Sequence, residues 1–310
     1  MSILVVGSVA FDSIETPQGK RDRCLGGAAT YFALSASYFT DVRVIAVVGE
    51  DFTAEHEAVL TSRGIDTQGL EHTPGKSFHW TGSYMKNLNE AQTLATELNV
   101  FETFSPKVPA AYKDSDFLFL ANIDPVLQSN VRAQMPNVRM VCGDTMNYWI
   151  SGHRSNLEKV LKGLDGLLIN DGEAKLLADN SNLVLAARKI LSMGPKTLIV
   201  KHGEFGATAF FGDQAFSGAS SITMPFRAPA LPLDEVVDPT GAGDSFAGGF
   251  FGYLASQPKV TLTSFKNAMF YGGVMGSFAV QRFGTERMQS LTREEIDQRF
   301  ALFRELSHLD

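Results

Sequence analysis

The chain has 310 residues, 44% of them hydrophobic and 20% charged, and its formal net charge at pH 7 is −7. This composition argues against disorder, and an acidic balance without a dense run of Lys and Arg argues against a nucleic-acid partner. No apolar run approaches the roughly 20 residues of a membrane span, and the first residues lack the pattern of a signal peptide. We therefore expect a cytoplasmic protein with no membrane partner. Cys24 and Cys142 lack paired spacing, which indicates neither a disulfide framework nor a zinc site.

Short runs rich in Val, Ile and Leu alternate with segments of helical periodicity. In chain order, strands are predicted at 3–7, 42–49, 116–121, 138–143, 166–170 and 197–201, and helices at 28–39, 54–64, 156–164 and 183–194. Apolar strands separated by crossover helices are typical of a parallel sheet that is covered on both faces. The sequence therefore predicts an α/β fold with a mostly parallel central sheet flanked by helices.

One region interrupts this alternation. From Gly64 to about Pro106 the sequence is polar and irregular, and 77–85 and 97–104 alternate like half-exposed strands. We expect one domain over 1–310, with a small β lid formed by roughly 12–25 and 64–106.

A glycine-rich segment at 236–254 is predicted to form a strand, a turn and an apolar helix. Gly241, Ala242 and Gly243 are small, so free backbone N–H groups at the helix start can face an anion. Asp244 follows directly, where a carboxylate can accept the proton of an attacking hydroxyl while the amides hold a phosphoryl group. Alternatively, Asp244 favours a helix N-terminus and the later glycines allow close helix packing.

Other glycine motifs do not fit. Five residues separate Gly69 from Gly75, where a P-loop has four, and 243–248 misses the nucleophile elbow of serine hydrolases by one residue. Gly7 stands alone after the first strand, so the usual dinucleotide fingerprint is missing. A dehydrogenase is therefore the third of three possible functions; the other two, a kinase and a nonenzymatic binding protein, are described below.

Three segments share a resemblance. These are DPTGAGDSF at 238–246, GGAATYFALSA at 26–36 and VVGSVAFD at 5–12. Together they resemble the two signatures and the opening strand of the ribokinase/PfkB family of carbohydrate and nucleoside kinases. The resemblance implies a sheet flanked by helices with a β lid, ATP with magnesium as phosphoryl donor, and transfer to a substrate hydroxyl.

The resemblance also implies roles for individual residues. Asp244 is the expected catalytic base, and Gly241, Ala242 and Gly243 form the anion hole. The expected substrate contacts are Asp12, Gly26, Gly27, Thr30 and Asn122. Many relatives have Asn where this chain has Thr30, so the groups that face the substrate differ.

Further residues are expected around the nucleotide. Asn170 and Glu173 match an N-x-x-E element that organises magnesium and phosphate, with Glu173 acting through water, although the same pair fits a helix capping box. The expected nucleotide contacts are Lys201, Gly203, Gly206, Asn267 and Gly273. Asp238 and Thr240 fall where some relatives bind an activating monovalent cation such as potassium.

The substrate is expected to be a sugar or a sugar-like alcohol, with a nucleoside kinase as the close alternative. A nonenzymatic binding protein of the same fold is a different class, and the intact Asp244 argues against it. Phe78 and Trp80 either stack on a nucleobase or cover core or a dimer contact, and a homodimer through the lid is expected on this basis. Arg23 and its basic neighbours either bind a phosphorylated sugar or lie in a solvated turn.

Overall fold

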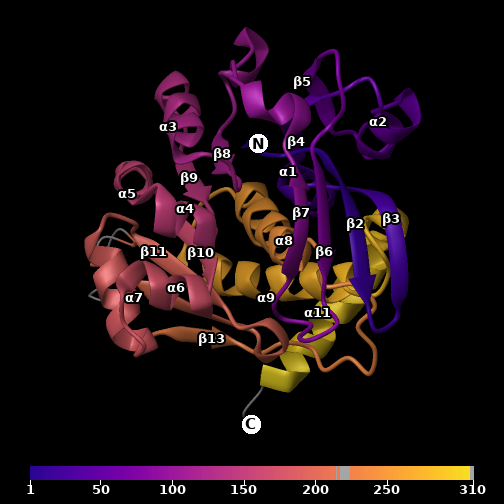
Figure 1. Cartoon of the computed structure of the whole chain (residues 1–310). Coiled ribbons are helices and arrows are strands. Elements are labelled where there is room, and N and C mark those ends of the chain that lie inside the picture. The colour runs from indigo at the N-terminus through magenta and orange to yellow at the C-terminus, as the bar shows by residue number, and fades with distance from the viewer. Residues whose placement is uncertain (214, 217–223, 308–310) are drawn as a thin grey trace.

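The computed structural model describes residues 1–213, 215–216 and 224–307, and two β-sheets organise this part of the chain (Figure 1). The large sheet runs, from edge to edge, through β13 (Phe226–Ala228), β12 (Ala207–Phe211), β11 (Thr197–Lys201), β10 (Gly166–Asn170), β9 (Met140–Gly143), β8 (Phe117–Leu120), β1 (Ser2–Val6), β4 (Asp41–Val48) and β5 (Asp66–His72). The strands from β11 to β5 are parallel, and β12 and β13 are antiparallel additions. The predicted mostly parallel sheet is confirmed.

Helices cover both faces of this sheet. One layer holds α1 (Ala28–Ala36), α2 (Ala54–Thr61), α8 (Ala242–Ser256), α9 (Leu262–Ala279), α10 (Glu286–Ser290) and α11 (Arg293–Ser307). The other holds α3 (Pro125–Gln134), α4 (Asn147–Gly152), α5 (Arg154–Leu161), α6 (Asp171–Ala178) and α7 (Leu183–Ser192). Along β1, Ile3 and Val5 join the first core and Leu4 and Val6 the second, as strand alternation requires. None of the described helices combines the length and apolar character needed to cross a membrane.

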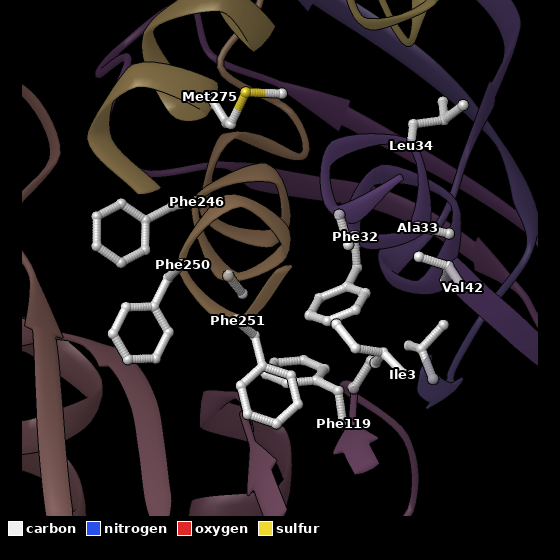
Figure 2. Packing of buried hydrophobic residues seen from close by; sticks show 14 of the residues in the cluster. Ile3, Phe32, Ala33, Leu34, Val42, Phe119, Phe246, Phe250, Phe251 and Met275 are labelled. Atoms are coloured by element: carbon white, nitrogen blue, oxygen red, sulfur yellow. The ribbon is translucent and has the colours of Figure 1, made fainter. Parts of the chain in front are cut away.

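The α8 helix is the centre of the first layer. The rings of Phe32 and Phe119 stack with centroids 4.2 Å apart, and Phe251 packs beside them (Figure 2). A Cβ on Gly248 would lie 2.3 Å from the Phe32 carbonyl oxygen in α1, and one on Gly249 would lie 2.8 Å from the Tyr271 carbonyl oxygen in α9. The later glycines therefore serve close helix packing, as the alternative interpretation predicted.

The second sheet has the order β3 (Gly19–Gly26), β2 (Ala10–Thr16), β6 (His79–Ser83) and β7 (Gln92–Glu97). It differs from the predicted lid in two places. Residues 66–72 form β5, which pairs with β4 at the edge of the large sheet. After β7 the chain forms a 3₁₀ turn, η1 (Asn99–Thr103), and not a strand, because Val100 and Phe104 are four residues apart and both enter the second core.

The segment before α8 also differs from the prediction. Residues 236–241 form a loop and not a strand, because the amides of Val237 and Asp238 both donate to the Val280 carbonyl oxygen at the end of α9. Two further 3₁₀ turns, η2 (Ala110–Tyr112) and η3 (Gly203–Phe205), complete the described elements.

Candidate active site

The start of α8 presents free backbone donors. Gly241 is its N-cap with φ of 70°, and a Cβ there would lie 2.3 Å from the ring of Tyr31, so both conformation and space require glycine. The Ala242 amide donates to the Pro239 carbonyl oxygen at 3.2 Å. The amides of Gly243 and Asp244 make no hydrogen bond to another described residue. Of the amides at this helix start, that of Ala242 is therefore already hydrogen-bonded, and those of Gly243 and Asp244 are free of partners among the described residues.

Lys201 supplies a positive charge beside these amides. It ends β11, and its Nζ lies 2.8 Å from the position that a Gly243 Cβ would occupy. A side chain at position 243 would displace the ammonium group from this place. Backbone donors, the positive end of the helix dipole and an ammonium group thus converge, which is the arrangement that stabilises a phosphoryl group.

Asp244 lies in the first turn of α8 and is half-buried. Burial raises its pKa to about 6, against the opposing effect of the Lys201 charge. A carboxyl group with a pKa close to neutral pH is suited to accept a proton and to release it again.

Asp144 is a site residue that the sequence interpretation missed. It directly follows β9 and is buried, and its Oδ1 has no hydrogen-bond partner among the described residues. Burial raises its pKa well above the usual value, and the nearby charge of Asp244 adds to this. The available signal was position: an acid after a parallel strand lies at the carboxyl edge where Asn170 and Lys201 also end their strands.

Asn170 and Glu173 form the capping box that the sequence also allowed. The Asn170 side chain accepts from the Glu173 amide and Glu173 Oε2 accepts from the Asn170 amide, both at 2.8 Å. Burial raises the pKa of Glu173, Lys201 lowers it and Asp244 raises it further, so Glu173 belongs to the same electrostatic group.

This group fits magnesium held through water. Among the residues described, no three His, Cys, Asp or Glu side chains form a metal cage. Glu173 keeps Oε1 outside the capping box, and Asp144 has an unpartnered oxygen. Mg²⁺ usually retains several waters and binds through one or two carboxylates and substrate phosphates, which matches this donor set.

Asp12 lies on β2 and is buried at 5% exposure. Its Oδ2 would be 1.9 Å from a Cβ on Gly26, so the carboxyl group lies directly over that glycine. The pKa of Asp12 is raised to about 7, chiefly by burial, against a backbone hydrogen bond from Gly27. The charge of Asp244 also raises the pKa of Asp12, which places the two acids within electrostatic reach.

The other two predicted substrate contacts have different surroundings. Thr30 is fully buried and its Oγ1 has no described partner. Asn122 is half-buried; its Oδ1 accepts from Trp149 Nε1 at 2.9 Å and its Nδ2 lies 3.2 Å from Met146 Sδ. Their substrate roles stay predictions.

The predicted nucleotide residues lie on β11, its following turn and α9. Gly203 and Gly206 have φ of 56° and 90°, and Asn89 from the β6–β7 connection lies against Gly203. Asn267 is half-buried in α9, and no described contact assigns it a role. A Cβ on Gly273 would meet the Phe303 ring of α11 at 3.1 Å, so this glycine faces another helix.

Asp238 ties two loops together. It is fully buried, its Oδ1 accepts from the Thr240 amide and its Oδ2 from the Gly284 amide, both at 2.8 Å. Thr240 Oγ1 in turn lies 3.4 Å from the hydroxyl oxygen of Tyr84, which directly follows β6 of the second sheet. These contacts connect that sheet to the loop before Asp244.

The aromatic residues in and around the second sheet divide into two groups. Phe78 stacks on Phe101 and Phe101 on Phe104, each at 5.4 Å between centroids, so these three rings cover core. Trp80 pairs in register with Asp12 on the neighbouring parallel strand, which puts both side chains on one face. Trp80 therefore lies on the same face of the sheet as Asp12, in a cluster with Tyr84 and Phe283.

Comparison with known proteins defines the class. The model of the "pfkB family carbohydrate kinase" matches residues 2–292. The chain belongs to this family, which confirms the resemblance seen in the sequence, and it is an ATP-dependent kinase of the sugar and nucleoside kinase group.

Individual relatives are similar over most of their length. A cytidine kinase of Thermococcus kodakarensis is 28% identical over 267 residues, which are 83% of this chain and 90% of the relative. A nucleoside kinase of Methanothermobacter thermautotrophicus is 28% identical over 92% of this chain and 91% of its own. The structure of a candidate ribokinase II from E. coli with ATP and Mg²⁺ has the same fold, with a TM-score of 0.76 at 20% identity, covering 97% of this chain and 99% of that one. Kinases of this family use ATP with Mg²⁺.

Proposed function

We propose that the protein transfers the γ-phosphoryl group of ATP to a hydroxyl of a nucleoside, with Asp244 as the general base. The observation that carries the chemistry is the convergence of the Asp244 carboxyl, the free amides of Gly243 and Asp244, and Lys201 Nζ at one helix start. The amides and Lys201 can hold the negative charge of a phosphoryl group, and the Asp244 carboxyl group beside them can take up a proton.

The phosphoryl group passes directly from ATP to the acceptor hydroxyl, without a covalent enzyme intermediate. Asp12 accepts a hydrogen bond from an acceptor hydroxyl and orients it toward the phosphoryl group. Asp244 takes the proton of the attacking hydroxyl. The oxygen of that hydroxyl bonds to the γ-phosphorus, and the bond between the γ-phosphorus and the ADP oxygen breaks. The amides and Lys201 stabilise the charge on the transferred group.

Magnesium, when bound with ATP, neutralises charge on the phosphates. Glu173 and Asp144 would hold it through water, and Lys201, Gly203 and Gly206 would line the nucleotide. Activation by potassium at Asp238 and Thr240 is a separate prediction. It is tested by comparing the activity in K⁺ with the activity in a larger organic cation at equal ionic strength.

A nucleoside is favoured over a free sugar for two reasons. Trp80 shares a face with Asp12, so a base attached to a bound ribose can stack on the indole ring. The two relatives that are 28% identical are named a cytidine kinase and a nucleoside kinase. The sequence alone favoured a sugar, and the family description keeps that as the second candidate.

Turnover assays decide between the candidates. ATP consumption is measured with cytidine, other nucleosides, free sugars and sugar phosphates, for wild type and Trp80→Ala. Nucleoside turnover supports the proposal if the KM rises in Trp80→Ala by a factor that corresponds to the loss of about 1–3 kcal/mol of stacking energy. Turnover of a free sugar with unchanged kinetics in Trp80→Ala overturns the nucleoside assignment.

Homodimerisation through the second sheet stays a prediction. β7 is an edge strand whose side chains are all exposed. Sedimentation of the wild-type protein would show a dimer if this edge pairs with a second copy, and a proline in β7 would then give a monomer.

A further inference from the structure

The strand opposite Asp12 contains a backbone irregularity. Pairing between β2 and β3 passes from Asp12↔Cys24 to Ile14↔Arg21, so Asp22 and Arg23 together lie opposite Ser13. Such a bulge re-aims neighbouring side chains. Arg23 has φ of 53°, a left-handed conformation that is uncommon for residues other than glycine.

Arg23 contacts both sequence neighbours of Asp12. Its amide donates to Ser13 Oγ at 3.1 Å, and its guanidinium carbon lies 4.4 Å from the ring centroid of Phe11. Because successive side chains in a strand alternate, Phe11 and Ser13 lie on the face opposite the Asp12 carboxyl group. Arg23 therefore contacts the face of β2 that lies opposite the Asp12 carboxyl group, and it does not face the acceptor site.

Asp51 holds Arg23 to the large-sheet side of the molecule. Its Oδ2 accepts from Arg23 Nη2 at 2.7 Å, and its Oδ1 accepts from the amide and the hydroxyl of Ser77, both at 2.7 Å. Ser77 is fully buried, and its Oγ also accepts from the Gly49 amide at 2.9 Å. Asp51 is thus anchored at the end of β4, and it links that anchor to β3.

We infer that Arg23, held by Asp51, is a positioning residue for Asp12: it fixes the segment of β2 that presents the carboxyl group to the acceptor hydroxyl. This inference rests on the proposed role of Asp12 in binding the acceptor. It also answers the earlier alternatives for Arg23, which is neither in a purely solvated turn nor aimed at a phosphorylated sugar.

The test separates acceptor binding from the other kinetic steps. We expect Arg23→Ala to raise the KM for the nucleoside about tenfold, below the roughly 100-fold effect of a 1 Å misplacement of reacting groups. Both kcat and the KM for ATP stay within about twofold of wild type, because ground-state acceptor binding is what changes. Arg23→Lys keeps the ion pair and recovers part of the loss.

A matched control exists in the large sheet. Arg43 pairs with Asp114 and lies over Tyr112, with 5.4 Å from its guanidinium carbon to the ring centroid. Arg43→Ala removes the same kind of contacts away from β2, and it leaves the acceptor KM unchanged. If Arg43→Ala and Arg23→Ala raise that KM equally, the effect is a general loss of stability and the inference is wrong.

Two further variants keep the outcome decisive. Asp51→Asn is nearly isosteric, so it tests the same link should Arg23→Ala fail to fold, and an unchanged acceptor KM in folded Asp51→Asn overturns the inference. Asp12→Asn reports on the proposed function itself. If Asp12→Asn leaves the acceptor KM unchanged, the role of Asp12 fails; if it raises the KM but the Arg23 and Asp51 variants do not, only the positioning role fails.

Discussion

Two helices of this protein begin at glycine-rich turns, Gly26–Gly27 before α1 and Gly241 before α8, and their first amides differ in whether they already have a hydrogen-bond partner. At α1, the Ala28 amide donates to Ser8 Oγ at 3.0 Å and the Ala29 amide to the Ser8 carbonyl oxygen at 3.0 Å. At α8, the Gly243 and Asp244 amides have no partner among the described residues. A glycine-rich helix start is therefore an anion site only where no neighbouring residue has already used its donors.

The largest expected effect is at the acid of the α8 start. Asp244→Asn keeps the shape and helix-capping ability of the side chain but cannot take a proton, so we expect kcat to fall by about 10²- to 10⁴-fold. The midpoint of thermal unfolding should barely move. Glu286→Gln, a first-turn acid of α10, is the control and should keep full activity. A folded Asp244→Asn enzyme with more than about a tenth of wild-type kcat would contradict the assignment.

The next effect contrasts one glycine from each of these helix starts. In Gly243→Ala the new methyl group meets Lys201 Nζ, the movable end of a side chain, so the ammonium shifts and kcat falls by about 10- to 100-fold, less than deleting a donor outright. In Gly27→Ala the methyl group meets the Ser8 carbonyl oxygen at 2.5 Å where φ is 92°. That change should lower the free energy of unfolding by about 1–3 kcal/mol or more. Steady-state kinetics and urea denaturation measure the two effects, and equal stability losses would refute the contrast.

The activity should depend on pH through Asp244. Because its pKa is raised to about 6, a falling pH protonates the base, and kcat/KM should drop by about tenfold per pH unit below that value. The assay is a pH profile of kcat/KM at saturating ATP. A flat profile down to pH 5 would show that no group with this pKa must be ionised.

A smaller effect is expected at the α1 start. Ser8→Ala removes the acceptor of the Ala28 amide, and leaving that donor unpaired lowers the free energy of unfolding by about 1–3 kcal/mol. Chemical denaturation measures this loss, and kcat should stay near wild type. A large fall in kcat with unchanged stability would place Ser8 in the chemistry instead.

Asp12 should also make the stability of the protein depend on pH. Burial raises the pKa of Asp12 from 3.8 to about 7, so between these values the folded state binds a proton that the unfolded state has lost. The free energy of unfolding contributed by Asp12 is therefore greatest at low pH and declines as the pH rises toward 7. Urea denaturation at several pH values should show a weaker decline in Asp12→Asn than in wild type.

The sequence predicted the elements that carry continuous apolar runs. The strands β1, β4, β8, β9, β10 and β11 have such runs because helices cover both of their faces. β5 was missed because it is a polar edge strand, with Leu70 as its only buried residue. The 97–104 segment was ambiguous, since a short apolar pattern fits a strand or a helical turn until the surface it packs on is known.

The candidate site shows the same limit. Asp244, Lys201 and Asp12 could be predicted because each lies in a segment that resembles the family. Which amides stay free depended on the Pro239 carbonyl oxygen, and that contact arises from the path of the loop. Asp144 belongs to no recognised motif, so only its position at the sheet edge could have revealed it.

The close packing of α8 has a consequence for engineering the enzyme. An α-helix is a stiff rod that rises about 1.5 Å per residue, so the free amides at its start and Gly248 one turn further on move as one body. Any side chain at Gly248 must push α8 away from α1, because its first atom would meet the Phe32 backbone at 2.3 Å. This displacement of α8 would also move the free amides of Gly243 and Asp244 away from their present positions. Stabilising replacements of helical glycine by alanine, a common way to harden a protein, should therefore begin elsewhere in this chain.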